Sequence, residues 1–153
     1  MSTWVPLRAI ATALAAAILL VGPPSARASD ASLGTTLARW STQIRFKARG
    51  VSLSATRRHP VRMTTKAKGF RRDAIAAQRA LRAQRPGTQR GRRAKALAIA
   101  AYGDYAVVGR EWALSGTARL RHELAVARQH ALRASRFARS GNRLLLRAAA
   151  LLR

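Results

Sequence analysis

The chain has 153 residues, of which 30 are Lys or Arg and only 5 are Asp or Glu, so its formal net charge is +25. It contains no cysteine, which excludes a disulfide framework and any site built on a thiolate. Five acids and three histidines leave few groups for proton transfer, and no glycine-rich loop has the spacing that cradles phosphate. We therefore expect neither catalysis nor a cofactor.

Residues 1–28 have the parts of a secretory signal peptide in the expected order. An apolar run over 9–22 is shorter than the roughly 20 residues that a membrane span needs. A Gly-Pro-Pro break follows, and Ala-Arg-Ala over 26–28 offers small residues at the positions that a signal peptidase reads. We expect cleavage between Ala28 and Ser29 and a secreted or cell-envelope protein. The alternative is a leader that is retained as a membrane anchor.

The first half of the remaining chain predicts one helix and one linker. An amphipathic helix is expected over 29–47, because apolar residues recur there at helical spacing: Leu33, Leu37, Trp40 and Ile44. Residues 48–68 contain several basic residues, no acid and a His-Pro pair. This composition indicates a flexible basic linker, and a lone edge strand over 51–53 is the less favoured interpretation.

Residues 69–153 are expected to form a helical domain. A helix over 69–84 ends before a Pro-Gly pair, and an antiparallel helical hairpin follows over about 92–139, with its turn at Ser115–Thr117. Two apolar stripes should face each other across this hairpin: Leu97, Ala101, Tyr105, Val108 and Trp112 against Leu120, Leu124, Ala127, Ala131 and Ala134. After a break at 140–142, a short helix over 143–153 would cap the open end, and a free amphipathic tail is the alternative. The fold class is therefore all-α, a small helical bundle built around the hairpin.

One edge of the expected hairpin gathers acids and a histidine. Three carboxylates and an imidazole can hold a metal ion, and these four residues share that edge: Asp104, Glu111, Glu123 and His130. Pairing of the acids with nearby arginines such as Arg119 is the favoured interpretation, because such clusters more often screen charge than bind metals. We therefore predict no metal site.

The charge pattern indicates a protein that binds anionic polymers. Guanidinium groups match phosphate and carboxylate geometry, so suitable ligands are teichoic acid, extracellular nucleic acid, an acidic polysaccharide or an acidic protein. Tyr102 and Phe137 lie off the apolar stripes and are expected to be exposed rings that can stack on bases or sugars. Seven basic residues within 16 positions that contain no acid are predicted to form the binding site: Arg57, Arg58, Arg62, Lys66, Lys68, Arg71 and Arg72.

Two further classes of protein remain open. Basic amphipathic helices can lie on a membrane surface, although alanine-rich faces have little volume to insert. An envelope structural module is the other class, because Arg outnumbers Lys 26 to 4 and GC-rich codon usage alone can produce such a bias. The sequence indicates no small-molecule substrate and does not fix the oligomeric state.

Overall fold

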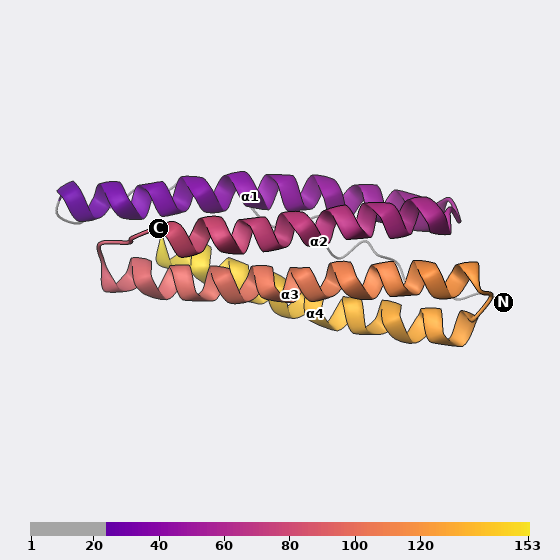
Figure 1. The fold of residues 1–153 in the computed structure, drawn as a ribbon. Coiled ribbons are helices and arrows are strands. Elements are labelled where there is room, and N and C mark those ends of the chain that lie inside the picture. The colour runs from indigo at the N-terminus through magenta and orange to yellow at the C-terminus, as the bar shows by residue number, and fades with distance from the viewer. Residues whose placement is uncertain (1–23) are drawn as a thin grey trace.

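The computed structural model describes residues 24–153, with side chains from residue 28, and this part of the chain forms four long helices without any strand. They are α1 (Pro24–Thr56), α2 (Pro60–Ala83), α3 (Gln89–Leu120) and α4 (Leu124–Leu151), joined by short turns (Figure 1). The prediction of an all-α fold is confirmed. The apolar run of the expected signal peptide lies outside the described residues, and the expected cleavage point falls within the first turns of α1.

α3 is the central helix of the arrangement. It packs along α2 and along α4, whereas α1 packs on α2 and meets α3 only over a short stretch. Figure 1 shows successive helices running in alternating directions. The α1–α2 and α3–α4 turns therefore lie at one end of the molecule, and the α2–α3 turn lies at the other end beside the start of α1.

The core combines many alanines with a few large rings. Residues of all four helices share one buried cluster. The ring of Phe70 on α2 lies 5.2 Å from Trp112 and 6.2 Å from Tyr105 on α3, measured between ring centroids. Alanine contributes little volume, so the helices approach closely around these rings. The apolar periodicity predicted for α3 is confirmed at Tyr105, Val108 and Trp112, which are at most 4% exposed.

The segment 48–68, expected to be a flexible linker with a possible strand, is helical almost throughout. α1 continues to Thr56 and α2 begins at Pro60, so only three residues separate the two helices. The His-Pro pair was expected to lie in the linker, whereas in the structure Pro60 is the first residue of α2 and His59 directly precedes it. Proline is well tolerated in the first turn of a helix, because the N–H that it lacks would have no partner there. Helical spacing also buries six residues of this segment: Ala48, Val51, Ser54, Ala55, Met63 and Ala67.

The α3–α4 hairpin has its turn at Arg121–Glu123, so the prediction of a turn at Ser115–Thr117 is wrong. Ser115 is buried within α3 and its hydroxyl donates to the Ala127 carbonyl at 2.9 Å. Because the turn comes later, two leucines that were expected to face the opposite stripe lie beside it and are exposed. Leu120 is 46% exposed and Leu124 is 67% exposed.

α4 also continues through the break that was predicted at 140–142. Gly141 is buried against α3, where a Cβ would lie 3.0 Å from the Tyr105 ring and 3.1 Å from the Ala101 carbonyl oxygen. The Tyr105 hydroxyl donates to the Asn142 amide oxygen at 2.5 Å. The glycine at this position therefore allows two helices to approach each other, and it does not end α4.

Candidate anion-binding surfaces

Asp30, near the start of α1, is a buried carboxylate that holds the α2–α3 turn. It is 3% exposed and accepts hydrogen bonds from the Gly87 backbone N–H at 3.0 Å and the Thr88 hydroxyl at 2.5 Å. The Thr88 oxygen in turn accepts from the Gly91 N–H at 2.9 Å and caps α3. A negative charge at this position is favoured by the dipole of α3.

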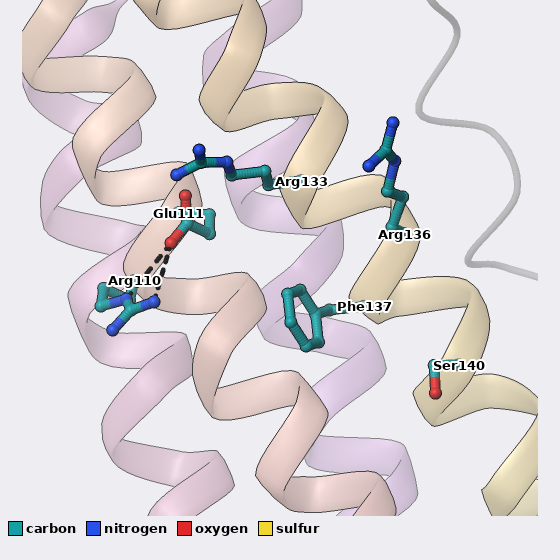
Figure 2. Close-up of a pocket in the computed structure, with 6 residues that line it drawn as sticks. All are labelled: Arg110, Glu111, Arg133, Arg136, Phe137 and Ser140. Carbon is teal, nitrogen blue, oxygen red and sulfur yellow. Dashed lines mark hydrogen bonds and ion pairs between the residues drawn. The ribbon is translucent and has the colours of Figure 1, made fainter.

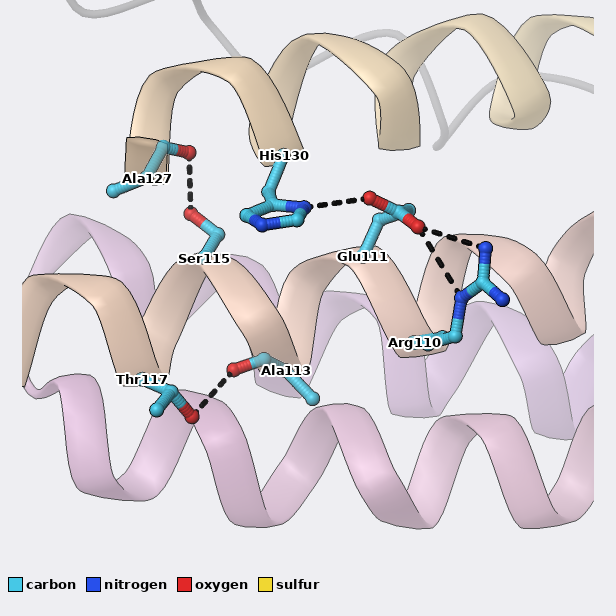
Figure 3. Close-up of polar contacts among 7 residues, drawn as sticks. All are labelled: Arg110, Glu111, Ala113, Ser115, Thr117, Ala127 and His130. Atoms are coloured by element: carbon cyan, nitrogen blue, oxygen red, sulfur yellow. Dashed lines mark hydrogen bonds and ion pairs between the residues drawn. The ribbon is translucent and has the colours of Figure 1, made fainter. Parts of the chain in front are cut away.

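Glu111 is the buried carboxylate between α3 and α4 (Figure 3). His130 Nδ1 donates to one carboxylate oxygen at 2.7 Å, and Arg110 Nη2 donates to the other at 3.0 Å. Burial raises the pKa of Glu111, but the hydrogen bonds from His130 and Arg110 lower it by more, so this pKa lies below its ordinary value. The pair formed by Glu111 and His130 is the realised part of the predicted acidic edge.

The other two members of that edge do not join the pair. Among residues 28–153, whose side chains are described, no group of three or more His, Asp or Glu residues could hold a metal ion. Asp104 is half-buried on α3, and Glu123 lies exposed in the α3–α4 turn. The position of the turn decides which residues of α3 and α4 face each other. A turn at Gly116 would have placed Glu111 opposite Arg121, whereas the turn at Arg121–Glu123 places it beside His130.

All seven residues of the predicted binding site are exposed, and we call this set the basic band. Arg57 and Arg58 lie in the α1–α2 turn, and the other five lie in the first half of α2. At about 100° per residue, Lys68 and Arg72 lie on the side of α2 opposite its buried stripe, and the remaining three flank that stripe. The band therefore wraps around a packed helix, where a flexible arm was expected.

The basic band has little carboxylate nearby to neutralise it. Asp73 is the acid of α2, and it is already held by α1: Gln43 donates to it at 3.1 Å and the Lys47 ammonium lies 3.8 Å away. Since Lys and Arg outnumber the acids 30 to 5, most basic side chains of the protein cannot have a carboxylate partner. The surface is therefore positive, and three of the five acids bind groups within the fold.

A second basic surface lies in an open groove between α3 and α4, with a volume of about 540 Å³ (Figure 2). Figure 2 shows the Arg133 side chain reaching from α4 toward Glu111 and the Phe137 ring directed at α3, whereas Arg136 points outward. We call this the α3–α4 groove, and six residues line it: Arg110, Glu111, Arg133, Arg136, Phe137 and Ser140. Its basic residues were not among those predicted from the sequence.

Tyr102 and Phe137 were both expected to be exposed, but only one of them is exposed in the structure. Phe137 is 38% exposed, so that prediction is confirmed. Tyr102 is completely buried, so its prediction is wrong; its hydroxyl lies 3.2 Å from the Ser41 hydroxyl of α1. Burial raises the pKa of Tyr102 to about 12, with the Ser41 hydrogen bond opposing the rise. The side of α3 that carries Tyr102 contacts neighbouring helices, which the hairpin alone did not reveal.

No protein-family model matches the sequence, and searches of curated proteins and of solved structures return no match. Within residues 24–153, no helix is both long and apolar enough to cross a membrane. Function therefore has to be inferred from the charge and geometry of the chain itself.

Proposed function

We propose that this is a secreted or cell-envelope protein that binds anionic polymers, without catalysis, through the basic band. The observation that carries the proposal is the exposure of seven Lys and Arg side chains within 16 residues that contain no acid. Because these residues belong to a packed helix and its adjoining turn, binding orders their side chains but not their backbone, which reduces the entropic cost of binding.

A flexible polyanion suits this surface better than a rigid, compact ligand. The basic residues point in several directions around α2, so a chain that can bend contacts more of them than a flat surface can. Arginine and lysine both bind phosphate and carboxylate, and arginine does so with two parallel hydrogen bonds. The suitable polymers are teichoic acid, extracellular nucleic acid and acidic polysaccharides.

The expected export route fits the burial pattern of α1. Cleavage between Ala28 and Ser29 would leave Asp30 in the mature chain. Asp30 is the first buried residue among the described side chains, because Ala28 is exposed and Ser29 is half-buried. Processing at that bond would therefore remove no described residue of the core.

The test compares two variants that lose the same charge from different surfaces. In the first variant, all seven residues of the basic band become Gln, which preserves helix propensity. In the control variant, seven exposed arginines elsewhere become Gln: Arg90, Arg92, Arg93, Arg121, Arg128, Arg139 and Arg143. Circular dichroism should show the same helical content in both variants, so that changes in affinity report on the binding surface.

Binding to heparin and to polyphosphate is measured over a series of salt concentrations. If the parent engages about five charges on a duplex-like polyanion, log K should fall against log salt with a slope of about −4.5, a loss of about 10²–10³ between 50 and 200 mM. The basic-band variant should flatten this slope more than the control variant does. Equal slopes for the two variants would contradict the proposal. Dye leakage from anionic vesicles without polymer binding would favour the membrane-active alternative.

A further inference from the structure

We propose that the α3–α4 groove is a second site, which binds one nucleotide of a single-stranded nucleic acid. This inference rests on the proposed function and deepens it, because it names the polymer. The groove lies on a different helix pair from the basic band, and it combines an exposed aromatic ring with three arginines.

The groove residues of α4 lie on one side of that helix. Arg133, Phe137 and Ser140 follow at spacings of four and three residues, so they form one row along about 10 Å of helix. Arg136 lies next to this row, and Arg110 of α3 also lines the groove, where its guanidinium is bound to Glu111. This length is comparable with that of one nucleotide, with a flat base at one end and a phosphate at the other.

The charges of the groove are arranged in two levels. The Glu111 carboxylate is only 4% exposed and already accepts hydrogen bonds from Arg110 and His130, so it forms a negative floor. Arg133 reaches toward this carboxylate and Arg136 points outward, so the two place positive charge at the groove opening. A phosphate is therefore attracted to the arginines and repelled by the floor, which leaves the space beside Phe137 for a neutral group.

The exposed ring of Phe137 is the feature that favours a base as this neutral group. Stacking of a base on an aromatic side chain strengthens binding to single-stranded nucleic acid by about tenfold or more for each base. Polyphosphate and teichoic acid carry no aromatic base. A nucleotide thus matches both the ring and the arginines, whereas a purely anionic polymer uses only the arginines.

The test separates stacking from charge by comparing oligothymidylate with an abasic strand of equal length. The two strands carry the same phosphates, and only the first carries bases. In fluorescence anisotropy the parent protein should bind oligothymidylate about tenfold more tightly than the abasic strand. Phe137→Leu should remove this preference and Phe137→Trp should retain it. Phe46→Leu is the matched control, because Phe46 is a 74% exposed ring on α1.

A pair of double variants tests the arginines. Arg133→Gln with Arg136→Gln should reduce the salt slope for oligothymidylate by about 0.7, because the site engages one phosphate and each phosphate contact on a single strand contributes about 0.7. Arg128→Gln with Arg139→Gln removes the same charge from another side of α4 and should reduce the slope less.

The possible failures are distinguishable. If the parent binds neither strand, nor polyphosphate, nor heparin, the proposed function itself is wrong. If it binds polyphosphate and both strands equally, or if Phe137→Leu and Phe46→Leu behave alike, only the nucleotide site is wrong. If heparin binding weakens as much as oligothymidylate binding in Phe137→Leu, the ring recognises sugars and the inference is overturned.

Discussion

Replacing Gly91 with alanine should destabilise the protein, although alanine is the better helix former. A Cβ at this position would lie 2.6 Å from the Asp30 carboxyl carbon and 2.7 Å from one of its oxygens, closer than a Cβ approaches such atoms in real proteins. Asp30 cannot move away freely, because it is buried and accepts hydrogen bonds from Gly87 and Thr88. The substitution therefore displaces a buried charge from its donors.

The magnitude follows from two opposing effects. Leaving a buried charge without its partner costs about 3–5 kcal/mol, whereas the change from glycine to alanine in a helix gains about 1 kcal/mol. The net loss of about 2–4 kcal/mol is a large part of the 5–15 kcal/mol typical of a whole domain. It should lower Tm by about 10 °C in a chain of this size.

Thermal and urea unfolding followed by circular dichroism measure this loss. Gly69→Ala is the control, because Gly69 also lies within a helix but a Cβ there meets no atom within 4 Å. That variant should gain about 1 kcal/mol. In an Asp30→Ala background, Gly91→Ala should cost much less, since the clashing group is gone. The reasoning is refuted if Gly91→Ala is as stable as Gly69→Ala.

Three more outcomes are expected. The fold lowers the pKa of Glu111, so the ionised carboxylate stabilises the protein above the unfolded pKa of 4.5, and this stabilisation is lost as pH falls through the folded pKa. The difference in unfolding free energy between the parent and Glu111→Gln should therefore shrink in acid. A difference that stays constant with pH would contradict this. His122 has φ 60° in the α3–α4 turn, so His122→Gly should relieve backbone strain and raise the free energy of unfolding in urea by about 1 kcal/mol. An unchanged urea midpoint would count against strain at this residue. Amino-terminal sequencing of exported protein should begin at Ser29; material that begins at Met1 and sediments with membranes would favour a retained anchor.

Helical periodicity was the part of the fold that local sequence could predict. The stripe of Leu33, Leu37 and Ile44 on α1 is buried, as the spacing of these residues required. This signal depends only on residues a few positions apart. It does not depend on which helix provides the opposite face, so Tyr105, Val108 and Trp112 on α3 are also buried although their predicted partners on α4 were partly wrong.

The turn between α3 and α4 could not be located in this way, because small residues serve both turns and close helix contacts. Gly116 lies against α2, where a Cβ would be 3.1 Å from the Pro60 carbonyl oxygen and closer still to the Thr64 hydroxyl. Only the packed structure shows this neighbour. The true turn contains His122 in a left-handed conformation, which glycine would adopt more easily.

The α3–α4 groove could not be predicted for a related reason. Its residues from α3 and α4 become neighbours only when the two helices pack in the correct register. That register is fixed by contacts far apart in the sequence, which join Ser115 to Ala127, Glu111 to His130 and Tyr105 to Asn142. An error of a few residues in the turn changes every such pairing. The spacing of Arg133, Phe137 and Ser140 on one side of α4 was the only local signal for the groove.

Three of the five acids of this protein occupy positions where helices meet. Asp30 joins α1 to the α2–α3 turn, Asp73 joins α2 to α1, and Glu111 joins α3 to α4. Asp73 and Glu111 also lie beside basic groups, so removing either would both break a junction and increase the repulsion across it. The residues of the basic band are exposed, and Arg136 at the groove points outward. The glutamine variants leave these three carboxylates and their hydrogen bonds in place, which is why they can test binding separately from folding.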